Sequence, residues 1–128
     1  MSETPRIGAI GWCDLTVPDA ETLKDFYASV AGWKPEALDM GGYNDFVMNG
    51  ADGTPVAGVC HARGVNSTLP PYWIVYIAVT DLDARMATIR AQGGAVIDGP
   101  RSCGPGVRVC IFRDPAGAVA GLCETVTP

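Results

Sequence analysis

An internal repeat constrains this chain more than any other feature of its sequence. The motif Val-x-Asp-x-acidic at residues 17–21 recurs at residues 79–83, 62 positions later, and Gly32 recurs as Gly94 at that spacing. The tetrapeptide VAGV at residues 56–59 returns as VAGL 63 positions later. Such repeats indicate one supersecondary unit used twice. Because a unit of about 60 residues buries little surface by itself, we expect the two copies to share a core.

The first copy reads as a βαβββ unit. Cys13, Leu15 and Val17 alternate with more polar residues, which predicts a strand over 8–17 whose apolar face packs on a helix. Asp19 is a suitable N-cap for that helix, and Gly32 is a suitable end. Three further strands are predicted over the rest of this copy, two within 36–49 around the Gly41-Gly42 turn and one at 54–61.

The second copy is predicted to contain the same elements in the same order. They are strands at 72–79, 95–98, 107–112 and 118–125, a helix from Asp81 to Gly93-Gly94, and a Gly/Pro loop at 99–106. The predicted fold class is α+β: one domain made of two βαβββ modules in tandem. We expect module one at 7–61, a linker at 62–71 and module two at 72–125.

Composition excludes several classes of function. The net charge is −5 with nine Lys and Arg and no basic run, which argues against nucleic-acid binding. No apolar run approaches the roughly 20 residues of a membrane span, and the N-terminus lacks a secretion signal. The five cysteines form no CxxC pair and are expected to be free thiols. We therefore expect a cytoplasmic protein without nucleic-acid or membrane partners.

Residues 17–33, VPDAETLKDFYASVAGW, and residues 112–118, FRDPAGA, carry a family resemblance. Together with the paired βαβββ pattern, they resemble the glyoxalase, bleomycin-resistance and extradiol-dioxygenase superfamily, also called vicinal oxygen chelate (VOC) proteins. The resemblance covers about residues 7 to 125. It implies that the two modules form a cupped, barrel-like mixed sheet with the ligand in the cup, within a homodimer.

The resemblance also implies where a metal would be held. Metal-dependent members use His, Glu or Gln at four cup-facing positions on the first and fourth strands of each module. The resemblance assigns these positions to Trp12, Gly58, Ile74 and Gly121. These side chains do not supply the N or O donors that a divalent cation needs. We predict that the usual metal site is absent, and we expect no cofactor.

If Trp12 and Gly121 face the cup, period-two alternation places further residues there. The two glycines leave room, and Trp12 offers a flat apolar wall, which suits a small, partly apolar or aromatic ligand. The predicted ligand-binding set is Trp12, Asp14, Thr16, Gly58, Cys60, Ile74, Tyr76, Gly121 and Cys123.

Asp14 is the most informative member of this set. It could act as a general base, bind a cationic group of the ligand or bond to Tyr76, whereas the commoner role is a carboxylate that meets solvent or a backbone amide. Cys60 and Cys123 could be nucleophiles or a thiolate metal pair, although small buried cysteines are common. His61, the single histidine, points away from the cup by alternation and is interpreted as a surface or linker-bonded residue.

Three functional hypotheses remain open at this point. The first is a metal-independent protein that binds a small molecule in the cup. The second is a small-molecule enzyme, a lyase, isomerase or dioxygenase/hydroxylase-like catalyst, that uses Asp14 and Tyr76 or a relocated metal. The third, a partner-binding or regulatory module, has the least support because the sequence carries no dedicated interaction tail.

Overall fold

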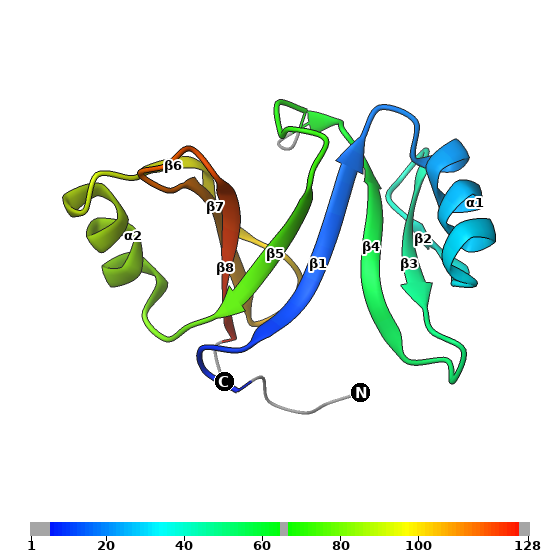
Figure 1. Cartoon of the computed structure of the whole chain (residues 1–128), viewed down its shortest axis with the longest axis horizontal. Helices are drawn as coiled ribbons and strands as arrows, with labels where there is room; N and C mark the ends of the chain where they lie inside the picture. The colour runs from blue at the N-terminus through cyan, green and yellow to red at the C-terminus, as the bar shows by residue number, and fades with distance from the viewer. Residues whose placement is uncertain (1–5, 65–66, 126–128) are drawn as a thin grey trace. The chain divides into compact units, whose positions relative to one another are not determined.

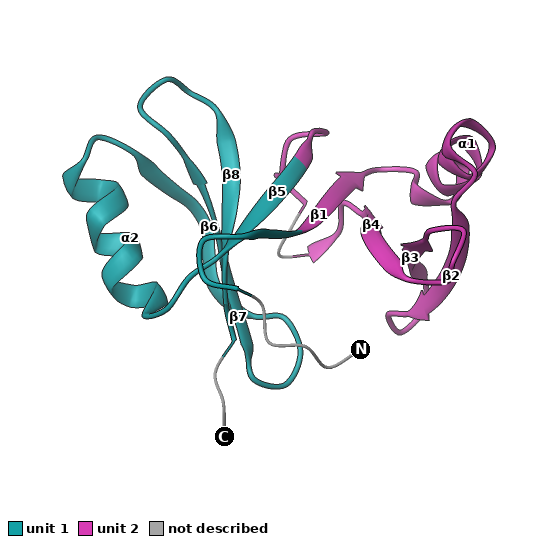
Figure 2. Ribbon diagram, turned by 60° about the horizontal axis from the view of Figure 1, so that its bottom comes forward, with its two compact units in different colours: residues 1–11, 74–128 teal, residues 12–73 magenta. Residues whose placement is uncertain are grey.

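A computed structural model describes residues 6–64 and 67–125 of the chain. Figure 1 shows its helices and strands, and Figure 2 shows its division into two compact units. Unit 1 comprises residues 1–11 and 74–128, and unit 2 comprises residues 12–73. Part of the predicted linker, residues 65–66, lies outside the described residues. The predicted fold class, α+β with two βαβββ modules in tandem, is confirmed.

Unit 2 holds the first module. Its four strands lie in the order β2-β3-β4-β1, and β1 runs parallel to β4 while the other neighbours are antiparallel. The strand β1 begins two residues before the boundary of the unit. The elements are β1 (Ile10–Val17), α1 (Ala20–Ala31), β2 (Lys34–Asp39), β3 (Asn44–Asn49) and β4 (Pro55–His61).

The ends of α1 follow the predicted capping residues. The Asp19 carboxylate accepts the N–H of Thr22 at 3.1 Å and so satisfies a donor of the first turn. Gly32 closes the helix in the left-handed conformation, with φ 72°, and donates its N–H to Ala28. Figure 1 shows α1 alongside β2 and β3.

The core of unit 2 lies between α1 and one face of the sheet. An aromatic group closes it, in which Trp73 donates Nε1–H to the Tyr27 hydroxyl at 3.1 Å and Trp33 stacks on Tyr27. Trp73 is therefore a packing residue. The buried apolar side chains of this core are Leu15, Val17, Ala20, Phe46, Met48 and Val59.

Unit 1 repeats the plan, with the strand order β5-β8-β7-β6 and a parallel pair of β5 with β8. Its helix is capped by Asp81, which accepts the N–H of Ala84, and Glu124 accepts the N–H of Leu82 at 2.9 Å. Leu82, Met86, Cys110 and Leu122 form the buried core on the side of its helix. The elements are β5 (Trp73–Ala78), α2 (Leu82–Ala91), β6 (Ala95–Ser102), β7 (Val107–Arg113) and β8 (Val119–Thr125).

The strand β6 differs from the prediction. We expected a strand ending at 98 and a loop at 99–106, but the strand continues to Ser102 across Gly99-Pro100. Its register with β7 shifts between Asp98 and Arg101, so the strand absorbs the Gly-Pro pair as an irregularity. Proline is tolerated here because β6 is the outermost strand of its unit's sheet.

Both helices are short, with 12 residues in α1 and 10 in α2. Within the described ranges, no helix is long and apolar enough to cross a membrane.

Candidate functional site

Each sheet has one face that packs on its helix and one face that does not, which we call the helix-free face. In unit 2, Leu15, Val17 and Val59 lie in the helix-side core. Alternation places the intervening residues of β1 and β4 on the helix-free face, and the parallel register sets Asp14 opposite Gly58 and Thr16 opposite Cys60. The structure thus brings together five residues of the predicted set: Trp12, Asp14, Thr16, Gly58 and Cys60.

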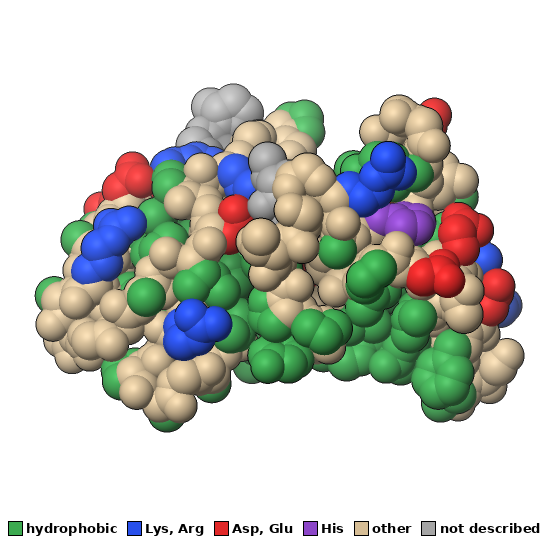
Figure 3. Space-filling model, turned by 90° about the horizontal axis from the view of Figure 1, so that it is seen from above, with side chains coloured by type: hydrophobic (Ala, Val, Ile, Leu, Met, Phe, Trp, Pro, Cys, Tyr) green, Lys and Arg blue, Asp and Glu red, His purple; other side chains and the backbone are tan. Residues whose placement is uncertain are grey.

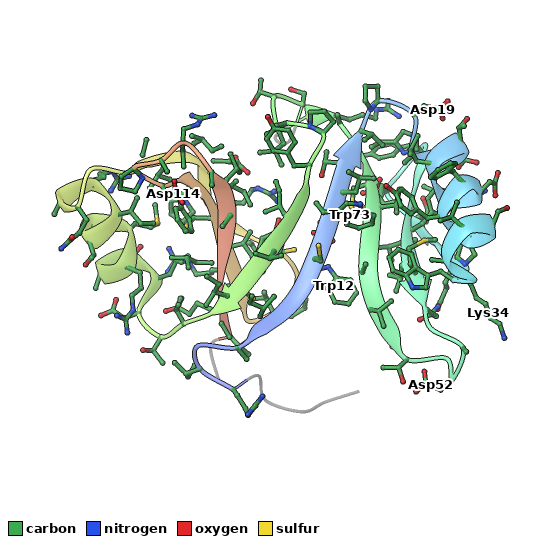
Figure 4. All side chains as sticks on the ribbon, viewed as in Figure 1. Trp12, Asp19, Lys34, Asp52, Trp73 and Asp114 are labelled. Atoms are coloured by element: carbon green, nitrogen blue, oxygen red, sulfur yellow. The ribbon has the colours of Figure 1, made fainter. Side chains whose placement is uncertain are left out.

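Trp12 and Asp14 form a hydrogen-bonded pair on this face. Trp12 donates Nε1–H to Asp14 Oδ1 at 2.6 Å in a partly buried position, and Figure 4 shows Trp12 on β1. A Cβ added at Gly58 would overlap Asp14 Oδ1 and would lie 3.7 Å from Cys60 Sγ. The carboxylate therefore lies directly over the backbone of Gly58. We expected Gly58 to leave room for a ligand, but Asp14 occupies that room.

Unit 1 repeats this construction with different side chains. Its parallel register sets Tyr76 opposite Gly121 and Ala78 opposite Cys123. A Cβ added at Gly121 would lie 2.5 Å from Tyr76 Cδ1 and 2.6 Å from Cε1, so the ring lies over this glycine. Tyr76 is 7% exposed and Ile74 is 1% exposed. Asp14 and Tyr76 occupy equivalent positions in the repeat. Each side chain lies over an equivalent glycine, Gly58 for Asp14 and Gly121 for Tyr76.

Two charged residues on β6 belong to the same face of unit 1 but were not among the predicted site residues. Asp98 pairs with Ile111, which pairs with Gly121, and Arg101 pairs with Val109, which pairs with Cys123. Arg101 donates Nε–H to Asp98 Oδ2 at 2.8 Å. The sequence carries one weak signal, two opposite charges on either side of Gly-Pro: Asp98 at the end of the predicted strand and Arg101 in the predicted loop at 99–106.

The cysteines of unit 1 give little support to a thiol nucleophile. Burial, and to a lesser extent the nearby Cys103 thiol, raises the pKa of Cys123 above its ordinary value. Cys110 lies in the helix-side core, where burial also raises its pKa. Reactive cysteines require the opposite change, a lowered pKa that yields thiolate. In unit 2, Cys60 is half-buried on β4 opposite Thr16.

His61 lies at the end of β4, and its partners are on β3. Its Nδ1 lies 2.9 Å from the Asn44 carbonyl oxygen, and its backbone N–H donates to Asp45 Oδ1 at 2.8 Å. The ring also meets Tyr43 edge-on at 5.5 Å between centroids. Figure 3 shows the histidine at the surface beside acidic side chains. His61 therefore connects β4 to the start of β3. These contacts are with residues 43–45 and not with the predicted linker.

The residues at the positions that the family resemblance assigns to a metal do not have side chains that can coordinate a metal ion. Trp12 has only a donor N–H, which Asp14 already accepts, and Gly58 has no side chain. In unit 1 the corresponding residues are Ile74 and Gly121, which have no donor atoms. Among the described residues, no three or more His, Cys, Asp or Glu side chains are grouped to hold a metal ion.

A shallow pocket of about 230 Å³ lies elsewhere on unit 1, between the end of α2 and the turn after β7. Its one charged residue is Asp114, which is labelled in Figure 4. The Asp114 carboxylate already accepts the N–H groups of Ala116 and Ala118. The pocket therefore offers mainly apolar contact, and we place the candidate site on the helix-free faces. The lining residues are Thr88, Ile89, Gln92, Gly94, Phe112, Asp114 and Pro115.

Comparison with known proteins gives matches in sequence. The family described as "Glyoxalase/Bleomycin resistance protein/Dioxygenase superfamily" matches residues 9–120. CFP32 of Mycobacterium tuberculosis, named as a candidate glyoxylase, is 34% identical over 119 residues, which cover 91% of this chain and 46% of that protein. The anthracycline biosynthesis protein DnrV of Streptomyces peucetius is 31% identical over 123 residues, which cover 87% of this chain and 45% of that protein. The chain spans about half the length of these curated relatives.

Solved structures show the same fold at lower sequence identity. The hypothetical protein BH1468 from Bacillus halodurans superimposes with a TM-score of 0.64 at 13% identity, covering 94% of this chain and 96% of that chain. A Streptomyces coelicolor methylmalonyl-CoA epimerase variant, in complex with 2-nitronate-propionyl-CoA, gives a TM-score of 0.59 at 19% identity. The match covers 95% of this chain and 100% of that chain. These similarities support the fold alone.

Proposed function

The chain belongs to the glyoxalase/bleomycin resistance protein/dioxygenase superfamily, and we propose that within it this protein binds a small, partly apolar or aromatic molecule. The proposed binding surfaces are the helix-free faces of the sheets. Binding there does not depend on the usual metal, because the family's metal positions hold Trp12, Gly58, Ile74 and Gly121, which lack suitable donors.

The observation that carries this proposal is the hydrogen-bonded pair of Trp12 and Asp14. The 2.6 Å bond fixes the carboxyl group and orients the indole ring, so a ligand meets an aromatic surface and a hydrogen-bonded carboxyl group that are already in place. Val47 pairs with Gly58 and adds a partly buried apolar neighbour on this face. An apolar surface with few fixed polar groups is the usual composition of a small-molecule site.

The names of the relatives support the aromatic character of the ligand. DnrV and DauV are both named as anthracycline biosynthesis proteins, at 31% and 30% identity. Anthracyclines are planar and polycyclic, a shape that an indole ring contacts well through offset stacking.

A binding experiment with an anthracycline tests this proposal. We expect saturable binding in isothermal titration calorimetry. Substitution Trp12→Phe removes the N–H donor and part of the ring, and it should raise the Kd about 3- to 10-fold, the size of one aromatic contact. Trp33→Phe is the matched control, because Trp33 packs against the helix-side core and should leave the Kd within about twofold.

Two results would contradict the proposal. One is the absence of saturable binding by this probe and by other polycyclic aromatic compounds. The other is an equal loss of affinity in the Trp12 and Trp33 variants, since that would place binding elsewhere.

A second candidate function, the small-molecule enzyme, rests on the same carboxylate. Trp12 holds Asp14 in one orientation, as a general base needs, in a partly buried position. Tyr76 supports this candidate less, because its ring lies over Gly121 and the residue is only 7% exposed. If a lyase, isomerase or dioxygenase/hydroxylase-like turnover is found, Asp14→Asn should reduce kcat; an unchanged kcat would remove Asp14 as the base. Elemental analysis of the purified protein tests a relocated metal.

A further inference from the structure

The helix-free face of unit 1 carries an arginine, Arg101, in an ion pair with Asp98. We propose that Arg101 binds the carboxylate of an apolar or aromatic acid on this face of unit 1. This inference rests on the proposed function, since it concerns small-molecule binding to a helix-free face, and it adds a chemical class of ligand for the face of unit 1. Guanidinium groups suit this task because their planar fork of N–H donors matches the geometry of a carboxylate.

The strand register places Arg101 on this face. Across the sheet, Arg101 pairs with Val109 and Val109 pairs with Cys123. Neighbouring Cys110 and Leu122 belong to the helix-side core, so the row that includes Val109 and Cys123 faces the opposite side. The adjacent row runs from Asp98 through Ile111 and Gly121 to Tyr76. The guanidinium therefore stands among apolar side chains and beside the row that carries the tyrosine.

The position of Arg101 is set by its backbone and by Asp98. Gly99 has φ 96° and lies so close to β7 that a Cβ would be 2.7 Å from the Val109 carbonyl oxygen. This close approach allows the register shift that separates Asp98 from Arg101. The 2.8 Å bond to Asp98 then holds the side chain, which is 27% exposed while Asp98 is 16% exposed. The partly exposed guanidinium is thus ordered in advance.

Arg101 has more N–H donors than its hydrogen bond to Asp98 Oδ2 engages. A guanidinium has five N–H donors, and the bond to Asp98 engages the one on Nε. Arg108 of β7 is a useful contrast, because it contacts two carboxylates, Asp83 at 3.1 Å and Glu124 at 3.4 Å. Of these two arginines, Arg101 has the greater remaining capacity to bind a second carboxylate.

Arg101 remains protonated and positively charged in this environment. Burial opposes the charged form, but the hydrogen bond and charge of Asp98 outweigh it, with smaller effects from Tyr76 and Cys103, so the pKa of Arg101 is raised. The chain as a whole carries a net charge of −5 and does not attract anions in general. A preference for an anionic ligand would therefore depend on directed hydrogen bonds from the remaining N–H donors of Arg101, not on the net charge of the protein.

Two probes with the same ring system test the inference. The probes are 2-naphthoate, which is anionic at pH 7.5, and 2-naphthalenemethanol, which is neutral, and both are titrated into the full chain by calorimetry. We expect the wild type to bind naphthoate about tenfold more tightly, the effect of one charge-assisted hydrogen-bonded pair. Arg101→Gln should abolish this preference and leave the Kd of the alcohol unchanged.

Controls separate recognition from folding. Asp98→Asn/Arg101→Gln removes both charges, so it leaves no partly buried carboxylate unpaired. It should lose the preference while retaining the wild-type circular dichroism spectrum. Arg108→Gln is the matched control on the same unit and should keep the preference for naphthoate.

The outcomes distinguish this inference from the proposed function. Equal affinity of the wild type for both probes overturns the role of Arg101 but leaves small-molecule binding intact. A preference that survives in Arg101→Gln also overturns it. If neither probe binds, the inference fails, and if the anthracycline also fails to bind, the proposed function fails with it.

Discussion

Substitution Gly121→Ala tests whether position 121 must be glycine because the Tyr76 ring lies over it. The new Cβ would lie 2.5 Å and 2.6 Å from two carbons of the Tyr76 ring and 3.3 Å from the Cys110 carbonyl oxygen. Because unstrained carbon atoms meet at about 3.5–4.0 Å, the ring must move by roughly 1 Å. Tyr76 is buried, so there is little free space for such a movement.

We expect this substitution to destabilise the protein by about 1–3 kcal/mol, the range found for overpacked cores. For a chain of this size, the melting temperature should fall by about 3–6 °C for each kcal/mol, so by roughly 3–18 °C. Urea denaturation followed by circular dichroism gives the free energy of unfolding directly.

Two further variants make the test specific. Gly11→Ala is the matched control, because a Cβ at Gly11 meets nothing within 4 Å, and it should be neutral or slightly stabilising. The double variant Tyr76→Val/Gly121→Ala removes the ring that clashes. Its free energy of unfolding should therefore exceed the value expected from adding the two single effects. A Gly121→Ala protein as stable as Gly11→Ala, or strictly additive effects in the double variant, would refute this reasoning.

Two other measurements test details of the structure. The hydrogen bonds from the Thr22 hydroxyl and backbone N–H lower the pKa of Asp19, so its charged form stabilises the fold above the ordinary carboxyl range near pH 4. The stability difference between wild type and Asp19→Asn should shrink as pH falls through the lowered pKa; a difference that stays constant from pH 7 to pH 2 would contradict this. In iodoacetamide labelling read by mass spectrometry, exposed Cys103 should react first, and buried Cys110, whose pKa is raised by burial, should react only in urea. Equal native rates for these two thiols would contradict the described burial.

The sequence was sufficient for the plan of the fold because its local signals agree with each other. Asp19 and Asp81 are both N-caps, each accepting an N–H three residues further on, as their repeated positions predicted. Period-two alternation also predicted which residues of β1 and β4 share a face. These features depend on backbone geometry and short-range patterns, which a single sequence records directly.

The chemistry of the faces was harder to predict because it depends on side-chain rotamers and on register across the sheet. Alternation placed Trp12 and Asp14 on one face but did not predict their hydrogen bond, or that Asp14 would lie over Gly58. Arg101 was missed because Gly99-Pro100 is a strong signal for a loop. The backbone pairing with β7 outweighs that local preference and returns Arg101 to the sheet.

The proline in β6 also bears on how this protein avoids unwanted association. β6 and β2 are the outermost strands of their respective units, and each contains a proline, Pro100 and Pro35. An outer strand normally presents unpaired N–H and C=O groups on which another chain can add a strand and start an aggregate. Proline removes one N–H donor, and its ring obstructs a continuous ladder. The Gly-Pro irregularity that positions Arg101 thus also interrupts the edge at which β-aggregation would begin.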